Sequence, residues 1–291
     1  MKIPAFLTQP GTPLARLITV ATTLLLAFCL FGAGFVACCL PPTTQMLSQN
    51  VRNTQLSPYD ADSLTNLAQT TRAYTVEGMA YPAYCEKECQ ALADLLNQGT
   101  LSPFAADRLR TATSQALTAE NDPSTLPETL TTATGDDAVA AAEAAALLND
   151  GLALSADSVV HLDQVHEVVI AALAVIVIAL ILLVASFGHV IFNYGRKAAS
   201  TCLIWAPVAM LTVLALFLVW ALADFDALFA WMHSLFFADG TWTFSVKSLL
   251  ICMYPEPFWM GMGVTWLLTT CIASVASLGV GIRMKRTDKH V

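Results

Sequence analysis

Four long stretches of the 291-residue chain are almost wholly apolar, and no acidic or basic side chain interrupts them. Each is longer than the roughly 20 residues that a helix needs to cross the hydrocarbon core of a bilayer. The pattern therefore predicts an all-α membrane protein with four transmembrane helices. The predicted spans are Leu17–Leu40, Val168–Phe192, Thr201–Ala223 and Phe258–Ile282.

The polar segment between the first two spans shows helical periodicity in several short pieces. Helices are predicted at Ser57–Gly78, Glu86–Asn97, Pro103–Ala112 and Ala138–Leu148. Thr113–Asp137 is instead rich in Thr, Ala, Ser, Asp and Pro, with almost no large apolar residues. Such a composition buries too little surface to offset the entropy of ordering, so we predict a mobile loop there.

The second span is predicted to extend outward without a break. Ser155 or Asp157 can cap the helix that leads into it. A helix rises 1.5 Å per residue, which places His161 about 10 Å outside Val168. This is the depth of the lipid headgroups.

The polar segment between the third and fourth spans opens with an apolar, aromatic run, Phe225–Phe237. The run is too short to cross a bilayer, so it is predicted to lie in the interface or to re-enter it. Asp239 and Gly240 then mark a turn. Trp242 and Phe244 follow as a strand-like alternating pair or as interface anchors.

Composition agrees with a membrane protein and adds its orientation. Mean hydropathy is +0.61, and charged residues make up 12% of the chain. Eight of the 14 Lys and Arg residues, but only one of the 22 acids, lie at the termini or in the turn between the second and third spans. Positive flanks stay in the cytoplasm, so both termini are predicted to be cytoplasmic.

This orientation divides the chain into alternating compartments. The predicted segments are a cytoplasmic N-terminus (1–16), the first span (17–40), an extracytoplasmic segment (41–167), the second span (168–192), a cytoplasmic turn (193–200), the third span (201–223), an extracytoplasmic interfacial loop (224–257), the fourth span (258–282) and a cytoplasmic tail (283–291). A signal peptide is the alternative for the first span. With both termini in the cytoplasm, the functional surface is predicted to lie on the outer face of a cell membrane.

Cysteines and acids offer little chemistry by themselves. Cys85, Cys89 and Cys252 are predicted to face the oxidising side, where a Cys85–Cys89 bridge is conceivable although a regular helix points the two thiols awkwardly. No Cys/His spacing is typical of a metal site. The acidic exterior lacks a basic patch, which argues against nucleic-acid binding.

Two of the five histidines stand out as candidate catalytic residues. His161 and His233 are both predicted near the outer interface, on different segments. His166 is five residues from His161, about 140° around the helix, so these two do not share a face. Imidazoles with a near-neutral pKa can exchange protons with a reacting ester and amine. Ser234, beside His233, remains a candidate nucleophile.

Two stretches resemble the lipoprotein intramolecular transacylase (Lit) family of bacterial membrane proteins. The first, Leu154–Val165, resembles the family's helix entry, in which a histidine lies just before an Asp-Val pair. The second, Phe229–Trp259, contains His233–Phe237, then Gly240–Phe244, then Tyr254–Trp259. Against the family pattern, Gln164 stands where an acid is expected, and Met79–Asp150 resembles an insertion.

The resemblance implies a reaction and its residues. The α-amine of a diacylated lipoprotein's N-terminal cysteine would attack the ester at the middle (sn-2) glycerol carbon, giving a lyso-form lipoprotein. His161 and His233 would be the catalytic dyad, with Trp242, Tyr254 and Glu256 in support. The partners would be the lipoprotein and membrane lipid, and neither a cofactor nor a metal is implied. The oligomeric state stays open.

Two other functions remain alternatives. A membrane lipid ester hydrolase, using Ser234, would pass the acyl chain to water and release free fatty acid. A non-catalytic protein that binds lipid or a partner through its extracytoplasmic segment would keep its function without either histidine.

Overall fold

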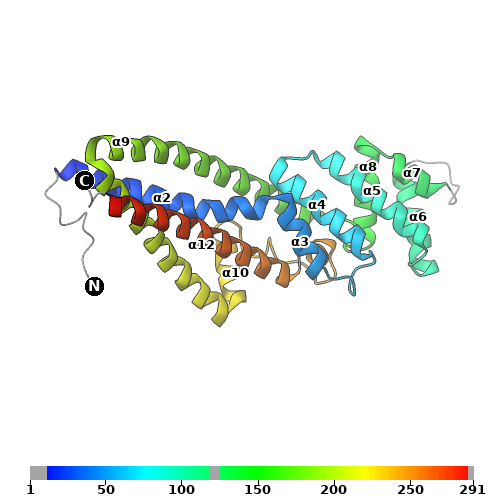
Figure 1. Ribbon diagram of the computed structural model, residues 1–291. Helices are drawn as coiled ribbons and strands as arrows, with labels where there is room; N and C mark the ends of the chain where they lie inside the picture. Colours follow the sequence, from blue (N-terminus) through cyan, green and yellow to red (C-terminus); the bar gives the residue numbers. More distant parts are fainter. Residues whose placement is uncertain (1–11, 118–124, 288–291) are drawn as a thin grey trace. The chain divides into compact units, whose positions relative to one another are not determined.

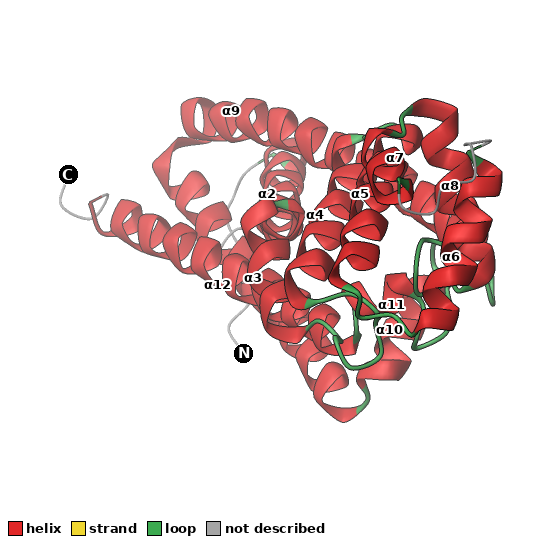
Figure 2. Cartoon of the chain, turned by 90° about the vertical axis from the view of Figure 1, so that its right-hand side faces the viewer, coloured by secondary structure: helices red, strands yellow, loops and turns green. Residues whose placement is uncertain are grey.

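Helices joined by loops make up residues 12–117 and 125–287, the part that the computed structural model describes (Figure 1). The helices are α2 (Pro13–Cys39), α3 (Pro41–Val51), α4 (Ala61–Glu77), α5 (Tyr81–Gln98), α6 (Pro103–Ala116), α7 (Leu126–Thr132), α8 (Gly135–Leu148), α9 (Ala156–Ala223), α10 (Phe225–Ser234), α11 (Leu249–Met253) and α12 (Glu256–Thr287). In these ranges Figure 2 shows only helices and loops, as predicted. Lys2, Asp288, Lys289 and His290 lie outside the described residues, as does the part of the predicted loop at 118–124.

The chain forms two compact units. The membrane unit comprises Met1–Cys38, Ala171–Met232 and Gly263–Val291, as far as these are described. The cap unit comprises Cys39–Ile170 and His233–Met262. Both candidate histidines therefore lie in the cap unit.

Within the described residues, three helices are long and apolar enough to cross a membrane: α2, α9 and α12. The 68-residue α9 is two helices joined at Gly195, whose φ of 81° and ψ of 174° are not helical. Glycine tolerates this backbone because it lacks a Cβ atom. The break falls in the predicted turn at 193–200, so the predicted spans at 168–192 and 201–223 lie on opposite sides of it.

Close helix packing in the membrane unit depends on a small residue in α2. The Trp266 indole of α12 donates a hydrogen bond to the Phe31 carbonyl (2.9 Å), and the two rings are 4.7 Å apart. A Cβ atom on Gly34 would lie 2.1 Å from Trp266 Cδ1. Only glycine lets the indole approach the α2 backbone this closely.

The cap unit has its own hydrophobic core. Helix α5 contacts α4, α7 and α8, and α6 contacts α8. Its residues Tyr84, Cys85, Cys89 and Leu92 are fully buried. The cysteines are free thiols, so the conceivable Cys85–Cys89 bridge is not formed.

The prediction of a mobile loop at Thr113–Asp137 is wrong for the described residues. Helix α6 continues to Ala116, and α7 forms at Leu126–Thr132. Leu126 and Leu130 are buried one helical turn apart, and they anchor α7 in the core. Its threonine hydroxyls bond to carbonyls of the preceding turn, as Thr129 does to Thr125 (3.0 Å). Two buried leucines are thus enough to hold a helix in this segment, although its overall composition is polar.

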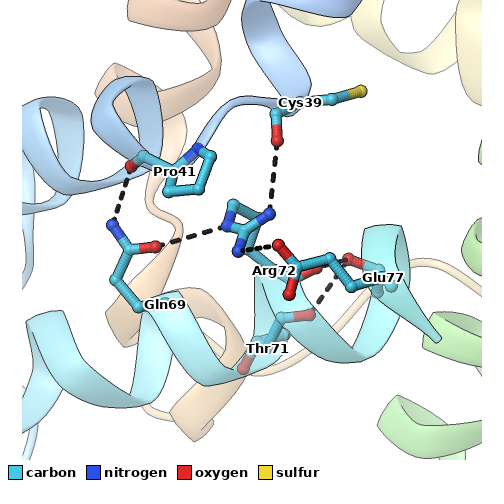
Figure 3. A network of polar contacts seen from close by, with 7 residues as sticks. Cys39, Pro41, Gln69, Thr71, Arg72 and Glu77 are labelled. Atoms are coloured by element: carbon cyan, nitrogen blue, oxygen red, sulfur yellow. Dashed lines mark hydrogen bonds and ion pairs between the residues drawn. The ribbon is translucent and has the colours of Figure 1, made fainter. Parts of the chain in front are cut away.

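A polar network ties the start of α3 to α4 within the cap unit (Figure 3). The buried Arg72 guanidinium donates to Glu77 Oε1 (2.7 Å), to the Cys39 carbonyl (3.3 Å) and to Gln69 Oε1 (3.3 Å). Gln69 Nε2 in turn donates to the Pro41 carbonyl (2.9 Å). The network therefore fixes the start of α3 against α4 within the cap unit.

A buried carboxyl group holds the segment that leads into α9. Glu88 is 1% exposed, and its Oε1 accepts a hydrogen bond from the Leu154 N–H (2.9 Å). Nearby, the Tyr59 hydroxyl donates to the Leu152 carbonyl (2.5 Å). Burial raises the pKa of Glu88 to about 7, against the opposing effect of the Leu154 hydrogen bond.

We expect the stability of the cap unit to fall as the pH rises from about 4.5 to about 7, because the native state then holds a proton on Glu88 that the unfolded chain has lost. Glu88→Gln keeps an acceptor for Leu154 and removes the charge. The variant should be more stable at pH 8, by up to about 3 kcal/mol. Thermal unfolding in detergent at pH 5 and pH 8 measures the difference. The exposed Glu143→Gln is the control, and an equal pH response in both variants would contradict the expectation.

Candidate functional site

His161 lies in the second turn of α9. Of the two predicted caps, Ser155 is the one that the structure shows. Its carbonyl accepts a hydrogen bond from the Val159 N–H (3.0 Å), and its hydroxyl accepts one from the Ser158 N–H (3.3 Å). His161 is 7% exposed. The predicted continuous helix thus delivers a buried imidazole to the cap unit.

Two contacts with α4 fix the rotation of this part of α9. The Tyr74 hydroxyl donates to the Asp163 carboxylate. His166 Nδ1 lies 2.9 Å from the Thr75 carbonyl. His166 therefore serves as a tie to α4, on a different side of α9 from His161.

His233 lies at the end of α10 and is 8% exposed. Its carbonyl accepts hydrogen bonds from the N–H groups of Phe236 (3.0 Å) and Phe237 (2.9 Å), which close the turn after the helix. No strand forms in the described residues that follow, so the alternative of a strand-like pair at Trp242 and Phe244 is wrong. The turn at Gly240, with φ of 82°, is as predicted.

Backbone hydrogen bonds hold the later segment of the cap unit to the earlier one. The Leu249 N–H donates to the Asp150 carbonyl (2.7 Å), and the Asn53 N–H donates to the Cys252 carbonyl (3.0 Å). The chains approach so closely that a Cβ atom on Gly151 would lie 2.8 Å from the Lys247 carbonyl oxygen. These contacts fix the loop that follows His233.

The two histidines face each other although 72 residues separate them in the sequence. Their ring centroids are 6.3 Å apart and the ring planes differ by 24°. Because a hydrogen bond spans about 3 Å, both imidazoles can reach a single ester group between or beside them. The structure therefore brings the predicted pair together.

Three aromatic rings enclose the pair. The Phe237 ring contacts both imidazoles: its centroid lies 4.7 Å from that of His161 and 5.7 Å from that of His233. Phe244 lies 5.5 Å from His161, and Trp242 lies 4.8 Å from His233. Trp242 is one of the predicted supporting residues, whereas Phe237 is not among the predicted site residues. Its only signal in the sequence is the density of aromatic residues around His233, which by itself predicts an interfacial segment.

Burial controls the protonation of His161. Loss of hydration on burial and, to a smaller extent, the neighbouring His233 together lower the pKa of its imidazole to about 4. His161 is therefore neutral near pH 7. Within the described chain its Nδ1 has no hydrogen-bond partner, and neither has the buried Oε1 of Gln164 one turn away. Buried polar atoms are normally paired, so the Gln164 oxygen is available to accept a hydrogen bond from a ligand, and the His161 nitrogen to accept or donate one according to its tautomer.

We expect the His161 imidazole to remain neutral from pH 8 down to about pH 5. In His233→Ala its pKa should rise, because both the neighbouring ring and part of the burial are lost. Histidine-selective NMR titration in detergent, with His161→Gln used to assign the resonance, measures both values. A His161 titration near its ordinary value of 6.5 in the unmodified protein would contradict the expectation.

The other predicted site residues lie elsewhere in the cap unit. The buried Tyr254 hydroxyl donates to the Ala68 carbonyl, and its ring contacts Phe258 at 4.7 Å. Glu256 is exposed in the first turn of α12. Neither makes a hydrogen bond or ring contact with the imidazoles in the described part of the chain. Ser234 is exposed at the end of α10.

The described residues contain no cluster of three or more His, Cys, Asp or Glu side chains able to hold a metal ion.

Comparisons with known proteins find similarity to one family. Residues 126–259, just under half of the chain, match the model of the family described as lipoprotein intramolecular transacylase Lit. The match includes both histidines. No curated protein sequence matched the chain.

The fold is similar to a solved structure of the membrane integral lipoprotein intramolecular transacylase Lit from Bacillus cereus. The TM-score is 0.59 at 15% identity, over 97% of this chain and 100% of that one. A structure of the same B. cereus protein with a single histidine substitution gives a TM-score of 0.47 at 14% identity, over 95% and 94% of the two chains. The resemblance predicted from the sequence is confirmed.

Proposed function

We propose that this chain, which matches the Lit transacylase family over the region that holds its histidine pair, transfers an acyl chain within a bacterial lipoprotein. The α-amine of the N-terminal cysteine attacks the carbonyl carbon of the sn-2 ester. A carbon–nitrogen bond forms, the bond between that carbon and the glycerol oxygen breaks, and the glycerol oxygen takes up a proton. The product is a lyso-form lipoprotein with an N-acylated cysteine.

The facing imidazoles of His161 and His233 are the observation that carries this proposal. The attacking amine must lose a proton and the leaving alkoxide must gain one, so two exchangeable imidazoles match the two tasks. The amine and the ester belong to one molecule. Holding them together supplies much of the rate, and no further reactant is needed.

The low pKa of His161 constrains its part in the reaction. An imidazole with a pKa of about 4 cannot deprotonate a free ammonium group with a pKa near 8. The amine must therefore arrive uncharged. Its proton becomes acidic only when the carbon–nitrogen bond forms, and a weak base then suffices. We assign His161 as the base and His233 as the donor to the oxyanion and the leaving oxygen.

The position of the site relative to the membrane is part of the proposal. The distribution of Lys and Arg favours cytoplasmic termini and four spans, with α9 providing two of them on either side of Gly195. The cap unit then lies outside the cytoplasmic membrane, at the level of the outer leaflet. Lipoprotein ester groups are found at this depth.

Mass spectrometry of the N-terminal lipopeptide of one lipoprotein, made in a host without a transacylase, tests the proposed reaction. We expect expression of this chain to move one acyl group onto the cysteine nitrogen without changing the total mass. Release of free fatty acid would instead identify the hydrolase alternative. An unchanged diacyl lipopeptide, with the protein shown to be inserted in the membrane, would leave the non-catalytic alternative.

A further inference from the structure

The two imidazoles are nearly sealed from solvent, at 7% and 8% exposure, although they lie beside a loop. Part of this seal is Phe237, whose ring contacts His161 at 4.7 Å and His233 at 5.7 Å. Phe237 itself is only partly buried. This residue therefore covers part of both imidazoles and also reaches solvent.

A backbone hydrogen bond holds Phe237 close to His233. The Phe237 N–H donates to the His233 carbonyl (2.9 Å), so both residues belong to the same turn. Beyond it, the Ala238 carbonyl accepts bonds from the Thr241 N–H (3.2 Å) and hydroxyl (2.8 Å). This turn returns the chain so that Trp242 lies against His233. The aromatic cover is thus a built feature of the loop.

Water is the natural competitor of the amine in the proposed reaction. If water attacked the same ester carbon, a carbon–oxygen bond would form, the glycerol oxygen would take the proton, and free fatty acid would leave. The same two imidazoles would assist this reaction equally well. An acyl-transfer site must therefore keep bulk water from its base.

We propose that Phe237 determines the acceptor of the acyl chain, by excluding water from the His161–His233 pair so that only the substrate's own amine reaches the ester. This inference rests on the proposed acyl transfer. Phe237 is assigned because it lies against both imidazoles, whereas Phe244 lies against His161 and Trp242 against His233.

The test uses two synthetic substrates with the full-length protein in detergent. One is a diacylated lipopeptide with a free α-amine, which reports transfer. The other is the same lipopeptide with its amine acetylated, so that water is the only available acceptor. The reaction is run in ¹⁸O-labelled water, and both N-acyl product and labelled free fatty acid are measured. The variants are Phe237→Leu, Phe237→Val and Phe237→Ala.

We expect the unmodified protein to act on the free amine and to leave the blocked substrate intact. Release of labelled fatty acid from the blocked substrate should increase as residue 237 becomes smaller, and in Phe237→Ala it should exceed the unmodified protein's at least about tenfold, which corresponds to 1.4 kcal/mol in the barrier. Loss of structure alone would lower both activities and could not create this release. Phe236→Ala is the matched control, because that ring is adjacent, 58% exposed and packed on Phe237.

Equal, low release in all three variants, with transfer to the free amine retained in at least Phe237→Leu, would overturn the inference and leave the proposed function standing. Failure of the unmodified protein to act on the free amine would overturn the proposed function itself. If Phe237→Ala does not fold, the comparison of the Leu and Val variants decides the matter.

Discussion

Replacing His161 or His233 by alanine should lower the rate of acyl transfer by at least about 100-fold each, the low end of the range for a positioned acid or base. Either change removes one of the two imidazoles that face each other at 6.3 Å. The amine proton or the leaving oxygen then has to exchange with solvent, from which the site is nearly sealed. The double variant should be little worse than either single one, because residues that act as a unit are not additive.

The rate of N-acyl lipopeptide formation, measured by mass spectrometry with purified protein, gives this result directly. His189→Ala is the control, because His189 belongs to the membrane unit and its ring contacts Tyr194. It should retain full activity. If folded His161→Ala or His233→Ala kept an acyl-transfer rate within a few fold of the unmodified protein's, the assigned dyad would be wrong.

Gly34→Ala should strongly destabilise the membrane unit. The added methyl would lie 2.1 Å from Trp266 Cδ1 and 2.6 Å from Thr270 Oγ1. The indole must then move, and its hydrogen bond to the Phe31 carbonyl is lost with it. Overpacking of this kind typically destabilises a protein by about 1–3 kcal/mol. Trp266 fluorescence should also change, since the ring leaves its contact with Phe31.

Thermal unfolding in detergent measures the effect. Gly279→Ala is the matched control in α12, because a Cβ atom there meets nothing within 4 Å. Alanine also favours a helix over glycine by up to about 1 kcal/mol, so this control should be unchanged or slightly more stable. An unchanged melting temperature for Gly34→Ala would show that α2 and α12 pack less closely than described.

The helices could be predicted where local signals are strong. The apolar runs need no tertiary information, because length and lack of charge alone indicate a span. In the cap unit, the Asp60 side chain caps α4 at the Ser63 N–H, and Gly78 ends it in the left-handed region. Such signals lie within a few residues of the boundary that they set. The predicted start at Ser57 was nevertheless four residues early.

Features that depend on distant partners could not be predicted. Helix α7 exists because Leu126 and Leu130 insert into a core formed with α5. A composition average over Thr113–Asp137 hides those two residues. The positions of Trp242 and Phe244 likewise depend on contacts with imidazoles, which override their alternating pattern.

The candidate site shows the same division. His161 and His233 could be selected by residue type, expected depth and family resemblance. Their mutual approach could not, because it depends on contacts such as that of the Leu249 N–H with the Asp150 carbonyl, 99 residues earlier. Phe237 could not be predicted for the same reason. In the sequence it is one of several aromatic residues, and only the fold places it against both imidazole rings.

The contacts that complete the cap unit come late in the chain, and this has a consequence for biosynthesis. Tyr254 reaches back to Ala68 across 186 residues, and Cys252 reaches back to Asn53. Since ribosomes add about 5–20 residues per second, a nascent chain carries His161 for several seconds before these anchors exist. During membrane insertion the chain therefore has half of a histidine pair and no aromatic cover. The paired imidazoles and their aromatic neighbours are held together only after the segment that contains Cys252 and Tyr254 has been made.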